Sequence, residues 1–166
     1  MKYLPAKKDH FIDIPAGTLH AINRDVLTYN ISRNADLTYR LFDYDRVDPN
    51  TGAKRELHIE KVLDNVLVPD TSEGFVWVAP YEKMGCEITD YWDEAGLYSL
   101  SRIKTKDQGN YGLDRFAFIT VVDGAGTVND VAVSKGETIL VPAGIDQLNI
   151  AGTLDLFAAS YRNGGE

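Results

Sequence analysis

The first candidate for chemistry in this sequence is His20, which follows a Pro-Ala-Gly turn in the stretch IPAGTLHAIN. A neutral imidazole at the start of a strand is a good zinc ligand, because the strand gives the ring a fixed direction. The competing interpretation is a partly buried histidine with a backbone partner. Zinc needs about three protein ligands, and we expect His10 on the preceding strand and His58 on a helix to be surface or capping residues. The pattern alone leaves both interpretations of His20 open.

A second candidate is Arg40, which stands among apolar and aromatic residues in LTYRLFDYDR, residues 37–46. An arginine in this setting either pairs with a structural carboxylate, such as the nearby Asp43 or Asp45, or reaches into a pocket to bind an anion. The local sequence favours neither alternative over the other.

The turn before His20 occurs a second time in the chain. In VPAGIDQLNI, residues 141–150, Gln147 stands where the first copy has its histidine. The apolar runs before the two turns also align, and each run is preceded at the same distance by a lysine. The distance between the copies is about that of one β-sandwich domain, so the repeat indicates two related β domains. The second copy lacks the metal-binding side chain.

The elements that must position these residues are short apolar runs separated by Gly, Pro, Asp and Asn. Such runs predict strands and, in this number, an antiparallel β-sandwich or barrel. Asp123-Gly124 and Asn129-Asp130 are typical hairpin turns. The glycines of DGAGTV precede a strand, so a hairpin is favoured over a phosphate-binding loop. The predicted strands are residues 10–15, 25–31, 37–44, 74–80, 97–103, 115–122, 126–133, 137–142 and 153–161.

One segment differs from this β pattern. In RELHIEKVLDNV, residues 55–66, apolar residues recur at helical spacing, and Pro69 follows. We therefore predict a bridging helix and linker at 55–74. The residues before it, 1–54, hold too few strands to close a sandwich, whereas 75–166 hold enough for a complete domain.

Composition and charge exclude several classes of function. The chain has 166 residues with 44% hydrophobic and 25% charged, which is typical of a folded protein. Its formal net charge of -8 disfavours nucleic acids and anionic membranes as partners. The single Cys86 excludes an internal disulfide. With no signal-peptide pattern at the start and no apolar run long enough to span a bilayer, we expect a cytoplasmic protein.

Three motifs together carry a resemblance to a known family. IPAGTLHAIN, ADLTYRLFDYDR and RELHIEKVLDNV, in this order and spacing, resemble the C-terminal part of type I mannose-6-phosphate isomerases. Gly136, followed six positions on by Pro-Ala-Gly, resembles the second motif of the cupin superfamily. The resemblance implies a cupin-type jelly roll at 75–166, joined by the helix to the closing strands of a second, incomplete cupin. These isomerases are zinc-dependent and interconvert mannose 6-phosphate and fructose 6-phosphate.

The resemblance also implies roles for individual residues. His20 matches the last metal ligand of the family, and Arg40 matches an active-site arginine that stabilises charge during isomerisation. The other ligands and opening strands of the catalytic cupin would lie before Met1, and no general base is assigned. We therefore expect a zinc- and hexose-phosphate-binding segment that is inactive alone and forms a homodimer or joins a chain supplying the missing strands. The alternative is a non-catalytic cupin for sugar binding or assembly.

Overall fold

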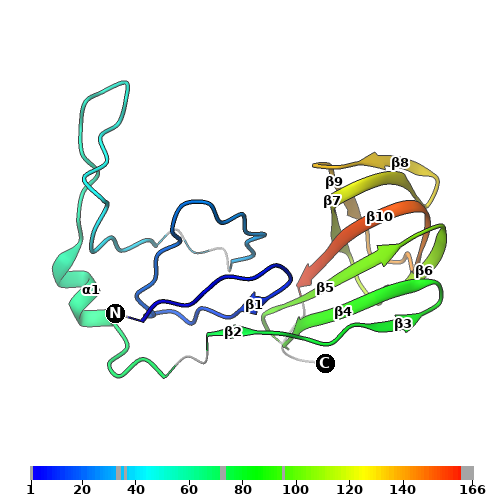
Figure 1. Cartoon of the computed structure of the whole chain (residues 1–166), viewed down its shortest axis with the longest axis horizontal. Coiled ribbons are helices and arrows are strands. Elements are labelled where there is room, and N and C mark those ends of the chain that lie inside the picture. Colours follow the sequence, from blue (N-terminus) through cyan, green and yellow to red (C-terminus); the bar gives the residue numbers. More distant parts are fainter. Residues whose placement is uncertain (1, 33–34, 36, 72–73, 95, 162–166) are drawn as a thin grey trace. The chain divides into compact units, whose positions relative to one another are not determined.

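The computed structural model describes residues 2–32, 35, 37–71, 74–94 and 96–161 (Figure 1). The chain divides into two compact units, Met1–Val76 and Trp77–Glu166, which are described separately below. The prediction of an all-β, cupin-like fold with one short helix is confirmed: the described residues form antiparallel strands and the helix α1, Ile59–Asn65. None of the helical structure described is long and apolar enough to span a membrane.

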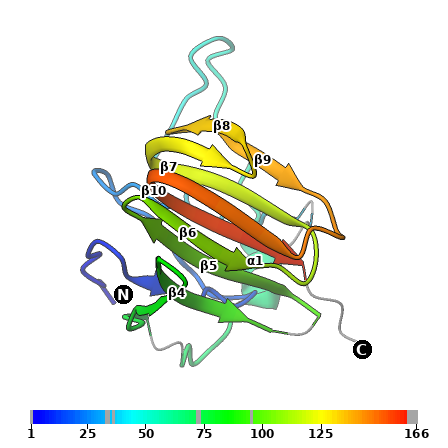
Figure 2. The same cartoon turned by 90° about the vertical axis from the view of Figure 1, so that its right-hand side faces the viewer.

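The C-terminal unit is one antiparallel sheet that bends into a barrel. Its strand order is β3-β4-β5-β10-β7-β8, with β6 pairing to β10 and β9 pairing to β7. Figure 2 shows β10 between β5 and β7. The strands are β3 (Tyr81–Lys83), β4 (Cys86–Asp93), β5 (Tyr98–Thr105), β6 (Gln108–Gly112), β7 (Ala117–Val128), β8 (Val131–Ser134), β9 (Thr138–Val141) and β10 (Gln147–Tyr161).

The core of this unit follows from the alternation of side chains along its strands. In β7, Ala117, Ile119 and Val121 are buried, and the residues between them are more exposed. Because successive residues of a strand point to opposite faces, this pattern places one row of apolar side chains inside the barrel. The buried cluster comprises Cys86, Ile88, Ile103, Ala117, Ile119, Val121, Val128, Val133, Val141, Leu148, Ile150, Leu154, Leu156 and Ala158.

The two longest strands, β7 and β10, approach each other closely at glycines. A Cβ at Gly124 would clash with the Thr153 carbonyl oxygen, and one at Gly126 would clash with the Ala151 carbonyl oxygen. Gly152 has φ of 111°, and a Cβ there would lie 2.7 Å from the Ala125 carbonyl oxygen. Only glycine leaves room for this contact between backbones.

The hairpin predicted at Asp123-Gly124 is therefore wrong. The strand continues through these residues, and the register shifts so that Val121 pairs with Leu156 but Asp123 pairs with Asp155. The glycines serve a bulge and a close approach within β7, which their sequence does not distinguish from a turn. The turn at Asn129-Asp130 is confirmed, because both residues have positive φ and join β7 to β8.

The N-terminal unit has little regular structure. Phe11–Ile12, β1, pairs with Phe75–Val76, β2. The strands predicted at 25–31 and 37–44 are not formed, because these residues have no strand partner in the described part of the chain. The helix predicted from residue 55 begins only at Ile59, after the N-cap His58. The reason is that residues 55–58 pair with the chain before them, as described below.

The N-terminal unit also lacks an apolar core of its own among its described residues. Val62 is their one buried hydrophobic side chain, whereas every other buried hydrophobic residue described lies in the C-terminal unit. Leu27 is fully exposed (100%), and Leu63, one turn of helix from Ile59, is 66% exposed. Apolar surface of this kind is costly to leave in water.

We expect Gly126→Ala to lower the free energy of unfolding of the barrel by about 1–3 kcal/mol, the usual cost of overpacking. Gly126 has no positive φ, so the effect reports the steric clash, chiefly with the Ala151 carbonyl and also with the Leu154 side chain at 3.0 Å. Gly112→Ala is the matched control, because its Cβ would meet nothing within 4 Å. Urea unfolding followed by circular dichroism measures both changes. Equal losses in the two variants would contradict the close approach as its cause.

Candidate functional site

The first predicted site residue is His20. It follows a turn that is held by one hydrogen bond within the turn and by another to the segment after α1. The Thr18 N–H donates to the Pro15 carbonyl at 3.1 Å, and Gly17 has φ of 91°. The Leu67 N–H donates to the Gly17 carbonyl at 2.9 Å, so the turn is tied to the end of α1. In the second copy of the motif, Gly144 has φ of 94°, so the two glycines share the same backbone conformation.

The His20 ring is exposed, and its Nδ1 lies 2.9 Å from the Thr18 carbonyl oxygen. A carbonyl oxygen can only accept a hydrogen bond, so Nδ1 carries the proton and donates it. The proton-free Nε2 then presents its lone pair away from the turn. Metal-binding histidines use this same arrangement, with one nitrogen oriented by a carbonyl and the other free to coordinate. His20 therefore has the donor chemistry of a metal ligand.

The second predicted residue, Arg40, is held by the residues that precede α1. Its backbone N–H donates to His58 Nδ1 at 3.1 Å, and the His58 N–H donates to the Arg40 carbonyl at 2.8 Å. The Arg40 guanidinium donates to the Glu56 carbonyl at 3.3 Å. Arg40 is thus fixed at its backbone by one side chain and oriented at its guanidinium by a main-chain oxygen.

This pairing continues outward as a hairpin of residues 40–58, seen in cyan in Figure 1. Arg55 makes a bidentate ion pair with Asp43, which is buried apart from 8% of its surface. Further along, Val47 pairs with Lys54, and the Asp48 N–H donates to the Ala53 carbonyl at 2.9 Å. The motifs around Arg40 and His58 are therefore the two arms of the same hairpin.

The ion pair in this hairpin has a defined dependence on pH. Hydrogen bonds from the Arg55 guanidinium hold the pKa of the Asp43 carboxyl below its ordinary value. A carboxyl whose pKa is lowered by folding stabilises the fold above its unfolded pKa of about 4. That contribution is lost as the pH falls through the lowered pKa, so the hairpin keeps its ion pair throughout the neutral range.

The structure does not join the two predicted residues directly. Within the described ranges, no hydrogen bond or ion pair links His20 to Arg40, and no group of three His, Cys, Asp or Glu residues could hold a metal. His10 packs against the Phe75 ring, with 6.0 Å between ring centroids.

Sequence reasoning missed the role of His58, which it placed on a helix. The available signal was that its motif follows that of Arg40 at a short distance.

We expect the Arg40 amide to be protected from hydrogen exchange in the native chain, because His58 Nδ1 accepts its proton. In His58→Ala this acceptor is lost, and exchange of that amide should become about tenfold faster or more, the equivalent of one hydrogen bond of about 1.4 kcal/mol. Hydrogen exchange followed by NMR measures the change. His20→Ala is the control and should leave the Arg40 amide unchanged; unaltered protection in His58→Ala would refute the contact.

Comparison with known proteins relates more than nine-tenths of the chain to one class of enzyme. The chain is 28% identical over 157 residues to the mannose-6-phosphate isomerase ManA of Bacillus subtilis, covering 92% of this chain and 49% of ManA. It is 26% identical over 166 residues to the mannose-6-phosphate isomerase of Streptococcus mutans, covering 94% of this chain and 50% of that enzyme. No protein-family model matches the sequence.

A solved structure supports the same relation. The crystal structure of the mannose 6-phosphate isomerase from Bacillus subtilis superposes with a TM-score of 0.66 at 28% identity, covering 76% of this chain and 41% of the other. The present chain spans about half the length of the curated relatives it matches. It resembles the C-terminal part of mannose-6-phosphate isomerases, as its motifs predict.

Proposed function

We propose that this chain is the C-terminal part of a mannose-6-phosphate isomerase-like enzyme, in which the N-terminal unit contributes His20 and Arg40 to the active site. The observation that carries the proposal is the fixation of Arg40 by His58 and Glu56, in a chain similar to these isomerases over more than nine-tenths of its length. The expected substrate is a phosphorylated hexose. The single cysteine favours a reducing compartment such as the cytoplasm.

We assign Arg40 the stabilisation of negative charge on the substrate. Moving a proton between C1 and C2 of an aldose and a ketose develops negative charge on the sugar oxygens. A guanidinium held in a fixed direction stabilises that charge without having to reorganise. The Glu56 carbonyl orients the guanidinium, His58 holds the Arg40 backbone, and the Asp43–Arg55 pair closes the hairpin beyond them. The general base is not assigned.

The metal implied by this family is zinc, and His20 fits it through Nε2. When bound, zinc supplies a positive charge that polarises oxygen atoms of the substrate. One histidine is not a site, so the remaining ligands would come from residues corresponding to the part of the relatives that this chain does not match. His20 contributes an imidazole whose tautomer is already set by Thr18.

We further propose that the exposed apolar surface of the N-terminal unit is covered by protein, either a second copy or a segment corresponding to the part of the relatives that this chain does not match. Leu27, Leu63 and their neighbours are exposed, and Val62 is the one hydrophobic side chain buried among the described residues of that unit. Unpaired extended segments and exposed apolar side chains both favour association.

The isomerase proposal is tested with mannose 6-phosphate and zinc in a coupled assay. We expect little turnover by the chain alone, and turnover when it is coexpressed with the N-terminal half of Bacillus subtilis ManA. In that complex Arg40→Ala should lower kcat by about a hundredfold, and His20→Ala should lower zinc content. Arg24→Ala, at an exposed position, is the control. A zinc-loaded complex without activity, or activity that survives Arg40→Ala, would count against the proposal.

The association is tested by size-exclusion chromatography with light scattering. We expect the purified chain to run as a dimer or larger species, and Leu27→Asp with Leu63→Asp to shift it toward monomer. Val131→Asp, at an exposed apolar position of the C-terminal unit, should leave the mass unchanged. A monodisperse monomer in the unsubstituted chain would exclude the homodimer.

A further inference from the structure

The C-terminal barrel contains a cavity that the isomerase proposal does not use. It has a volume of about 510 Å³ and opens at one end of the barrel, where β4, β5, β6 and the loop after β6 come together. A cavity of this size is within the range of small-molecule sites. Its lining residues are Asp90, Trp92, Asp93, Ser99, Ser101, Tyr111, Gly112, Leu113, Asp114 and Arg115.

The polar groups of this cavity are already organised. Asp90 accepts hydrogen bonds from Ser101 Oγ at 2.6 Å and from the Tyr81 hydroxyl at 2.8 Å, one on each carboxylate oxygen. Each of these oxygens has a further lone pair. The carboxylate is therefore fixed in direction and still able to accept a hydrogen bond from a ligand.

The charge of the cavity excludes an anionic ligand. It is lined by the carboxylates of Asp90, Asp93 and Asp114, and its one cation, Arg115, makes a bidentate pair with Asp114. Burial, together with the negative charges of these carboxylates, raises the pKa of Tyr111. A phosphorylated sugar would be repelled here. A metal ion is not favoured either, because no three acidic side chains in the described part of the chain lie close enough to hold one.

The remaining chemistry matches a neutral polyhydroxylated ring. Carboxylates accept hydrogen bonds from sugar hydroxyls, and the Ser99 hydroxyl can donate to sugar oxygens. The Tyr111 hydroxyl oxygen can accept from the ligand. Trp92 lines the cavity and stacks on Tyr98 behind it at 6.3 Å between ring centroids, so the cavity has one aromatic wall. An aromatic face of this kind packs against the C–H groups of a sugar ring.

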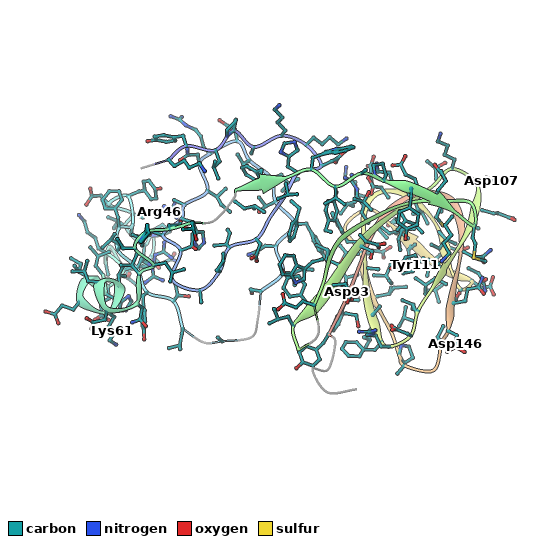
Figure 3. All side chains as sticks on the ribbon, turned by 90° about the horizontal axis from the view of Figure 1, so that it is seen from below. Arg46, Lys61, Asp93, Asp107, Tyr111 and Asp146 are labelled. Atoms are coloured by element: carbon teal, nitrogen blue, oxygen red, sulfur yellow. The ribbon has the colours of Figure 1, made fainter. Side chains whose placement is uncertain are left out.

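We propose that this cavity of the C-terminal unit binds an uncharged hexose, a ligand different from the phosphorylated hexose expected of the isomerase. Tyr111 lies within the barrel wall, and Asp93 and Asp107 lie on either side of it in Figure 3. Asp107 follows β5 at the opposite end of that strand from Ser99 and lies outside the cavity lining. It therefore provides a carboxylate control within the same unit.

The test uses Trp92 as the reporter. Trp77→Phe removes the other tryptophan, which is exposed, so that fluorescence reports only on the cavity. Titration of this variant with D-mannose and with D-glucose should give a saturable change for at least one of them, with a dissociation constant of about 1 mM. Mannose 6-phosphate should bind at least about tenfold more weakly, because of the carboxylates.

Side-chain variants locate the site. In the Trp77→Phe background, Asp90→Asn should weaken binding by about tenfold through loss of a charged acceptor, whereas Asp107→Asn should leave it unchanged. Asp93→Asn, at an exposed position, is the second variant if Asp90→Asn does not fold by circular dichroism. Absence of a saturable response to both sugars at about 100 mM, equal binding of mannose 6-phosphate, or equal loss in Asp107→Asn would overturn the proposal. None of these measurements requires zinc or isomerase activity.

Discussion

The C-terminal barrel depends on the contact between β7 and β10, where backbone meets backbone because glycines leave no side chain in between. β10 pairs with β5, β6 and β7, so it is the strand through which most of the sheet is joined. At Gly124, Gly126 and Gly152 the two longest strands bend together without breaking their pairing. The bend turns one continuous sheet around its apolar row.

The N-terminal unit is organised by polar contacts and not by burial. Arg40 and His58 exchange hydrogen bonds, and Asp43 and Arg55 form an ion pair one step further along the hairpin. These contacts hold the backbone on which Arg40 stands, and one hydrogen bond from its guanidinium to the Glu56 carbonyl orients the side chain, without an apolar core beneath it. The cost is a surface rich in exposed apolar side chains, which is the state expected of a segment that completes its packing against other protein.

The sequence predicted the elements whose signal is local. The alternation in residues 115–122 and 153–161 predicted strands that form, and Asn129-Asp130 predicted a turn that forms. β4, Cys86–Asp93, was missed although its Ile, Thr, Tyr and Trp residues favour a strand. β6 was missed because Gln-Gly-Asn-Tyr-Gly has no apolar run and is ordered by its ladder with β10. Gly124 and Gly126 were interpreted as a turn because the neighbouring sequence does not indicate that β10 approaches them closely.

The site followed the same rule. His20 and Arg40 were selected by type and spacing, and by the resemblance of their motifs to those of known isomerases, and their roles stay predictions. The pairing of Arg40 with His58 was not identifiable, because hydrophobic periodicity assigned residues 55–58 to a helix. The bonds that shorten the helix are formed with residues that lie earlier in the chain. Periodicity describes one segment at a time and carries no information about such a partner.

The two Pro-Ala-Gly turns show what can vary without disturbing a scaffold. Gly17 and Gly144 have the same left-handed backbone, yet three residues later one copy has His20 and the other has Gln147. The conformation of the turn is set by proline and glycine and places no demand on that third position. A side chain of different chemistry, such as histidine in place of glutamine, can therefore occupy that position through a single substitution while the turn keeps its conformation.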